Sequence, residues 1–147
     1  MPDLTFADAA QWFEQSAQDF ERDFRDAEQR TVDDALVIAE GLSSGPHSTA
    51  DLRRMGHPYA RRHGKPLLNP AIINAQTGTF RASWDGESPR PDGDGLTAAI
   101  FNTDPKAELL QSGTRTMFAR PIDAQIEEDL APRREARLER ALDKLTS

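Results

Sequence analysis

The segment from Leu4 to Glu40 constrains the fold most, because neither glycine nor proline interrupts it. Its apolar residues recur at steps of three and four, the spacing of one face of an α-helix. Phe6, Phe13, Phe20 and Ala27 repeat every seven residues, and Ala10, Ala17, Phe24 and Ile38 form a parallel row. Thr5 can cap the first turn, and Asp8 supplies an acid there. The pattern predicts one long amphipathic helix over residues 5–41.

A helix of this length is large relative to a chain of 147 residues, which suffices for one domain. An aromatic row at helical spacing most often belongs to a core. We therefore expect the helix to lie across a sheet or to pack against a neighbouring subunit. We expect a single domain over residues 1–147.

Residues 43–70 are predicted to form a loop, since Gly, Pro and Ser recur there. Within it, residues 56–66 contain glycine and proline together with aromatic and basic side chains that would suit a docking loop. His57 and His63 lack a carboxylate or cysteine at useful spacing, so we expect no metal site.

The sheet is expected within residues 71–121. Residues 79–85 and 96–102 alternate in polarity as half-buried strands do, and residues 86–95 are predicted to form a long mobile hairpin loop. Short strands are also expected at Ile72–Asn74 and at Met117 and Phe118.

Helices complete the predicted fold. Asp104 and Pro105 start a short helix that Gly113 ends before the Gly-Thr turn. A C-terminal helix covers residues 123–146, with Pro132 either starting or kinking its last part. The fold class is α+β, with a small, mostly antiparallel sheet packed by the long N-terminal helix.

Charge and composition exclude several functions. A formal net charge of -7 argues against coating duplex DNA, which requires basic surface. There is no cysteine for disulfides or thiol chemistry. No signal-type or membrane-spanning run is present, which predicts a protein made in the cytoplasm.

The sequence offers no convergent catalytic groups. Its serines lack a nucleophile elbow, and no glycine-rich turn joins a strand to a helix as nucleotide binding requires. We therefore expect no enzymatic activity, no catalytic residue and no cofactor.

Several short motifs follow one another in a recognisable order. After the long helix come Gly56-His57-Pro58-Tyr59-Ala60, then the run from Gln76 to Trp84, Asn102, Leu110-Gln111-Ser112-Gly113-Thr114, Met117, and Ala119-Arg120-Pro121. This order resembles the tail-component family of tailed bacteriophages, the small head–tail joining or tail-completion proteins. The likeness covers residues 56–125. Lys106 and Ala107 depart from it, because the family commonly has an aromatic-alanine pair before the short helix.

The resemblance implies a virion structural protein of the phage neck or tail top. Such a protein forms a homo-oligomeric ring, expected to be hexameric, that contacts other neck, connector or tail-tube proteins. The acidic balance of the chain suits a conduit through which DNA slides without specific binding. No membrane is involved, and the protein is located in the virion after synthesis in the host cytoplasm.

The residues expected at interfaces follow from this likeness and from the loops. Arg115 and Arg120 would pair with acids of the same or the next subunit, and Met117 and Phe118 would pack under the turn or against a neighbour. The docking loop would present His57, Tyr59, Arg61 and Arg62. Two alternatives remain: a tail terminator that caps the tail tube, and a small regulatory or antitoxin-like binding module.

Overall fold

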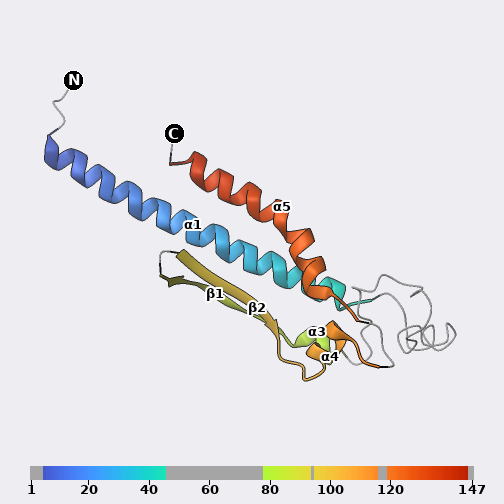
Figure 1. Cartoon of the computed structure of the whole chain (residues 1–147). Helices are drawn as coiled ribbons and strands as arrows, with labels where there is room; N and C mark the ends of the chain where they lie inside the picture. Colours follow the sequence, from blue (N-terminus) through green and yellow to red (C-terminus); the bar gives the residue numbers. More distant parts are fainter. Residues whose placement is uncertain (1–4, 46–77, 94, 116–118, 146–147) are drawn as a thin grey trace.

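The computed structural model describes residues 5–45, 78–93, 95–115 and 119–145. It has an α+β fold in which a long helix carries a two-stranded sheet and a second helix, as predicted (Figure 1). The described elements are α1 (Phe6–Leu42), α3 (Thr79–Ala82), β1 (Trp84–Asp92), β2 (Gly95–Asn102), α4 (Ala107–Ser112) and α5 (Ile122–Asp143).

Helix α1 begins and ends within one residue of the predicted bounds. A capping box fixes its start: the Thr5 hydroxyl accepts a hydrogen bond from the Asp8 amide at 3.2 Å, and the Thr5 amide donates to the Asp8 carboxylate at 3.0 Å. Its 37 residues are continuous. The Ser43 amide bonds to the Ala39 carbonyl at 3.0 Å and closes the other end.

The β1–β2 hairpin corrects the prediction for residues 79–95. Residues 79–82 form the short helix α3, and the segment predicted as a mobile loop is mostly strand β1, which pairs antiparallel with β2 from Trp84 opposite Asn102 to Asp92 opposite Gly95. Two prolines are tolerated in β1 because a two-stranded sheet has only edge strands, where an amide can remain unpaired. The register shifts between Glu87 and Arg90, so this irregular part of the strand contains the first proline.

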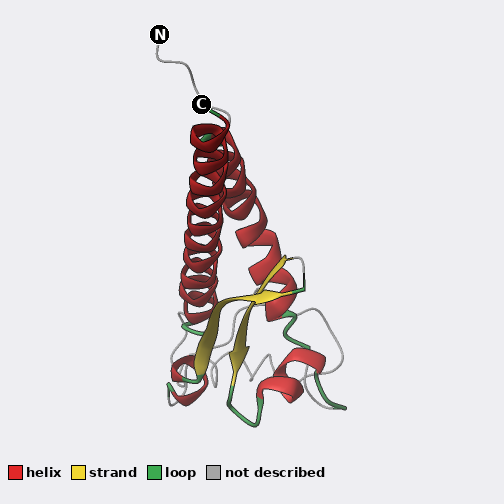
Figure 2. Ribbon diagram, turned by 90° about the vertical axis from the view of Figure 1, so that its left-hand side faces the viewer, coloured by secondary structure: helices red, strands yellow, loops and turns green. Residues whose placement is uncertain are grey.

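Helix α1 lies between the other two structural layers. The hairpin packs on one side of it, and α5 packs antiparallel along the other side (Figures 1 and 2). The core is formed by Ala35 and Ala39 of α1 with Ile122 and Ile126 of α5, and side chains of the hairpin and of α3 pack against it. Small residues on α1 allow α5 to approach closely.

Charged contacts continue the α1–α5 interface toward the N-terminus of α1. Arg134 donates to Glu28 at 3.1 Å, Arg137 pairs with Asp34, and Lys144 donates to Asp23 at 2.9 Å. Helix α5 therefore packs along the C-terminal part of α1, and these contacts end at Asp23.

The shorter helical predictions have mixed outcomes. Gly113 ends α4 with a φ of 75°, as expected for a glycine that stops a helix. Helix α4 begins at Ala107 rather than at Pro105; the Asp104 carboxylate accepts from the Lys106 amide at 2.8 Å and holds the preceding turn. Pro132 does not start a helix, because it lies inside the continuous helix α5. The predictions for residues 46–77 and for Met117 and Phe118 lie outside the described residues.

Candidate assembly interface

The junction between α4 and α5 folds back on itself. The Arg120 amide donates to the Leu110 carbonyl at 2.7 Å, and the Ile122 amide donates to the Gln111 side chain at 3.1 Å. These bonds bring the end of α4 against the start of α5. The segment that contains Gly113 and Thr114 thus connects α4 to α5.

The two predicted interface arginines occupy different environments. Arg115 is exposed, whereas the side chain of Arg120 lies within the chain and is only 2% exposed. Arg120 therefore contributes to the fold of the subunit itself, and its substitution should disturb that fold. Of the other predicted site residues, His57, Tyr59, Arg61, Arg62, Met117 and Phe118 lie outside the described residues.

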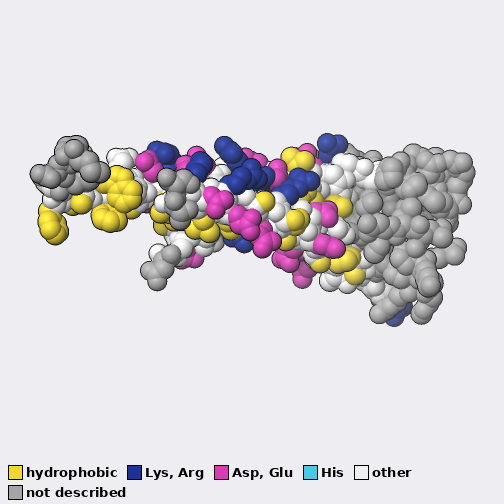
Figure 3. Space-filling model, turned by 90° about the horizontal axis from the view of Figure 1, so that it is seen from above, with side chains coloured by type: hydrophobic (Ala, Val, Ile, Leu, Met, Phe, Trp, Pro, Cys, Tyr) yellow, Lys and Arg dark blue, Asp and Glu magenta, His cyan; other side chains and the backbone are white. Residues whose placement is uncertain are grey.

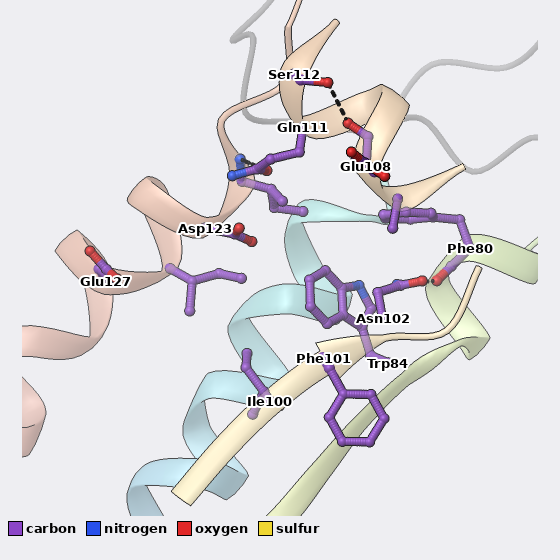
Figure 4. Close-up of a pocket in the computed structure, with 13 residues that line it drawn as sticks. Phe80, Trp84, Ile100, Phe101, Asn102, Glu108, Gln111, Ser112, Asp123 and Glu127 are labelled. Atoms are coloured by element: carbon purple, nitrogen blue, oxygen red, sulfur yellow. Dashed lines mark hydrogen bonds between the residues drawn. The ribbon is translucent and has the colours of Figure 1, made fainter. Parts of the chain in front are cut away.

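An open pocket of about 590 Å³ lies beside this junction (Figure 4). Phe80 and Trp84, whose rings lie 5.9 Å apart in an edge-to-face arrangement, line the pocket together with Ile122 and Ile126 of α5. Edge-to-face packing fixes the orientation of both rings. The pocket offers a mostly apolar surface with a defined shape.

Acidic side chains surround the apolar lining of this pocket. Glu108 comes from α4, and Asp123 and Glu127 come from the first turns of α5. Burial raises the pKa of Asp123 above its ordinary value, and the nearby charge of Glu127 raises it further. A pocket of this composition can bind an apolar group that carries a positive charge.

A second candidate surface is the N-terminal part of α1. Every residue from Thr5 to Gln15 except Ala9 is exposed, including Phe6 at 99%, Trp12 at 61% and Phe13 at 66%. Helix α1 extends here past the end of α5 and past the tip of the hairpin (Figure 1). Hydrophobic side chains gather on this projecting end in the space-filling view (Figure 3).

This exposure corrects the prediction that the aromatic row belongs to a core. Only the C-terminal half of α1 is buried within the chain, from Ala27 onward, while Phe20 and Phe24 are half-buried. The seven-residue repeat of phenylalanine already contained the signal, because a strict repeat of this kind is typical of a helix that pairs with another helix. The pocket had no comparable signal, since its lining comes from five separate elements, α3, β1, β2, α4 and α5.

Neither the protein-family models nor the curated proteins nor the solved structures include a match to the chain. Among the described helices, none is long and apolar enough to span a membrane. In the same part of the chain, no three His, Asp or Glu side chains gather closely enough to hold a metal ion.

Proposed function

We propose that the chain is a non-catalytic structural protein of a tailed-phage virion. It forms a ring at the neck or tail top and joins or completes the tail at the head–tail interface. The observation that carries the proposal is the projecting end of α1, whose phenylalanine and tryptophan side chains face solvent in the isolated subunit. Exposed apolar surface of this kind marks contacts with other proteins.

The order of motifs supports the particular assembly. Gly113-Thr114 and Ala119-Arg120-Pro121 resemble the tail-component signature. The bonds from Arg120 to Leu110 and from Ile122 to Gln111 give these residues a structural role at the α4–α5 junction. A motif with a structural role, and not a catalytic one, is consistent with a protein whose function is assembly.

The acidic pocket beside the junction supplies a second contact surface. Its apolar lining and its carboxylates suit a neighbouring protein that inserts a basic side chain with an apolar stem. In the proposed ring this partner is the adjacent neck or tail-tube protein.

The experiment that tests the proposal is to locate the chain in a purified particle. We expect mass spectrometry to detect it in intact virions, and labelled antibody to bind between head and tail in electron micrographs. Particles that lack the protein should accumulate as separate heads and tails. Intact, infectious particles formed without the chain would refute the proposal and favour a regulatory binding module.

A further inference from the structure

The spacing of large and small residues on the projecting end of α1 specifies what covers it. Phe6, Ala10, Phe13, Ala17, Phe20 and Phe24 are spaced alternately by four and three residues. We call these six residues the seam. This 3.5-residue average is the repeat of a helix packed along another helix in a coiled coil. The seam consists of a phenylalanine row at 6, 13 and 20 and a second row at 10, 17 and 24.

We propose that the seam binds the seam of a second copy of this chain in antiparallel orientation. Parallel pairing would place each row against its own copy, so phenylalanines would crowd one another while alanines faced alanines. Reversing one helix places the two rows opposite each other, and in the inner layers of the seam a large side chain then meets a small one. In this register Phe13 packs against Ala17 of the partner subunit, and Ala10 packs against Phe20 of the partner subunit.

Each end of the proposed helix pair meets an open cavity of the other subunit. In the same register, Phe6 reaches Phe24 of the partner subunit. An open cavity of about 650 Å³ lies there, lined by Phe20, Phe24 and the tip of the hairpin, including Leu96. A phenylalanine side chain that enters this cavity replaces solvent next to apolar atoms.

The pairing also continues an interface that the fold already uses. The α5 helix covers α1 up to Asp23, where Lys144 bonds to that residue. Exposed Leu142, in the last turn of α5, and exposed Leu145, just past its end, are close to Lys144 in the sequence. The incoming helix would therefore continue the helix packing where α5 ends, and it would cover both leucines. In this register the two-fold axis passes level with Gln15, with Glu14 on one edge of the seam and Ser16 on the other. Glu14, which is exposed, therefore lies near Glu14 of the partner subunit as a like-charge contact.

Light scattering on the purified full chain tests the pairing. The unmodified protein should assemble through the seam as a dimer or as a larger species built from dimers. Phe13→Gln should weaken association at least about tenfold, because two phenylalanines leave the interface. Val37→Gln is the matched control: Val37 is 68% exposed on α1 but is not part of the seam, so association should be unchanged.

Phe13 is exposed in the subunit, so Phe13→Gln should still fold, and circular dichroism can verify this. A loss of association in a folded variant is then due to the seam. A monomeric full chain would assign the seam to another protein or to a lipid surface and would overturn the self-pairing. An assembly whose mass is unchanged by Phe13→Gln would overturn it too.

Disulfide formation tests the orientation, since the chain has no native cysteine. Ser16 borders the seam and in the antiparallel pair lies opposite its own copy, so Ser16→Cys should form a dimer on mild oxidation. Ala10→Cys should not, because Ala10 then faces a phenylalanine. The reverse result would indicate parallel pairing and overturn the proposal.

This inference rests on the proposed function only in that copies of the chain associate. A two-fold pair closes on itself, so other surfaces would make the contacts of the ring, and the two proposals fail separately. A virion protein that is monomeric in solution would overturn only the pairing. A dimer that is never found in particles would overturn only the virion role.

Discussion

At the scale of single residues, Gly86 of β1 lies close against helix α1. A Cβ atom at this position would lie 2.8 Å from Cγ1 of Val32 and 3.3 Å from Cδ1 of Leu36. Val32 is buried and β-branched, so it cannot rotate away freely. Glycine is therefore required by the approach of the hairpin to α1.

Replacing Gly86 by alanine should consequently destabilise the subunit. We expect Gly86→Ala to lower the free energy of unfolding by about 1 to 3 kcal/mol, as overpacking does. Urea denaturation followed by circular dichroism measures this. Gly41→Ala is the control, because a Cβ atom there meets nothing within 4 Å and alanine favours the helix. Equal stability of both variants would contradict the close approach.

Burial also separates the two arginines of the junction. Arg120 is enclosed, so Arg120→Ala removes a long buried side chain and should lower the free energy of unfolding by about 2 to 4 kcal/mol. Arg115 is exposed, and Arg115→Ala should change it by no more than about 0.5 kcal/mol. Thermal denaturation of the two purified variants compares them. A stable Arg120→Ala protein would show that the buried side chain is not needed for the fold and would leave a role in contacts between subunits.

At the scale of elements, the capping box determines how well the exposed start of α1 persists in solution. The hydrogen bonds from the Thr5 side chain and backbone lower the pKa of Asp8 below its ordinary value of 3.8. A carboxylate with a lowered pKa stabilises the folded helix at neutral pH. This stabilisation is lost as the pH falls below that ordinary value, because the protonated group no longer accepts both bonds.

We therefore expect the first turn of α1 to fray in acid while the rest of the helix persists. Exchange of the Asp8 and Ala9 amides, which bond to the Thr5 hydroxyl and carbonyl, should increase as the pH falls below 3.8, after correction for intrinsic exchange rates. Thr5→Ala should show fast exchange already at neutral pH, whereas Thr5→Ser retains the cap. Protection that is the same in all three proteins would show that the box does not hold this end.

Sequence patterns predicted elements better where local chemistry alone determines them. The capped helix α1, strand β2 and the glycine stop of α4 depend on neighbouring residues, and all were predicted. Strand β1 was not, because its prolines favour a loop and only the pairing with β2 makes it a strand. The pocket and the burial of Arg120 depend on the way α4 and α5 meet, which the sequence does not specify locally.

The difference between local and long-range determinants also explains why the burial of the aromatic row of α1 was predicted wrongly. Its periodicity predicted an apolar face correctly, but periodicity does not say whether the covering partner belongs to the same chain. The answer depends on the lengths of the elements: α5 reaches only Asp23, so the first part of α1 is left exposed.

At the scale of the whole molecule, net charge and apolar contacts oppose each other in the proposed self-association. Each copy carries a formal net charge of -7, so the copies repel one another at long range. Salt screens this repulsion, with a Debye length of about 10 Å at 0.1 M, but it does not weaken burial of phenylalanine. Association through the seam should therefore tighten as the salt concentration rises from low values.

Interfaces held by ion pairs, such as the predicted contacts of Arg115, would show the opposite dependence, because salt screens attraction as well. Sedimentation velocity over a series of sodium chloride concentrations distinguishes the two. Tighter association with added salt in the unmodified chain, together with a weak response in Phe13→Gln, would assign the dominant contact to the apolar seam. Association that weakens with salt and is lost in Arg115→Ala would assign it to charge pairs, since no apolar interface loses strength in this way.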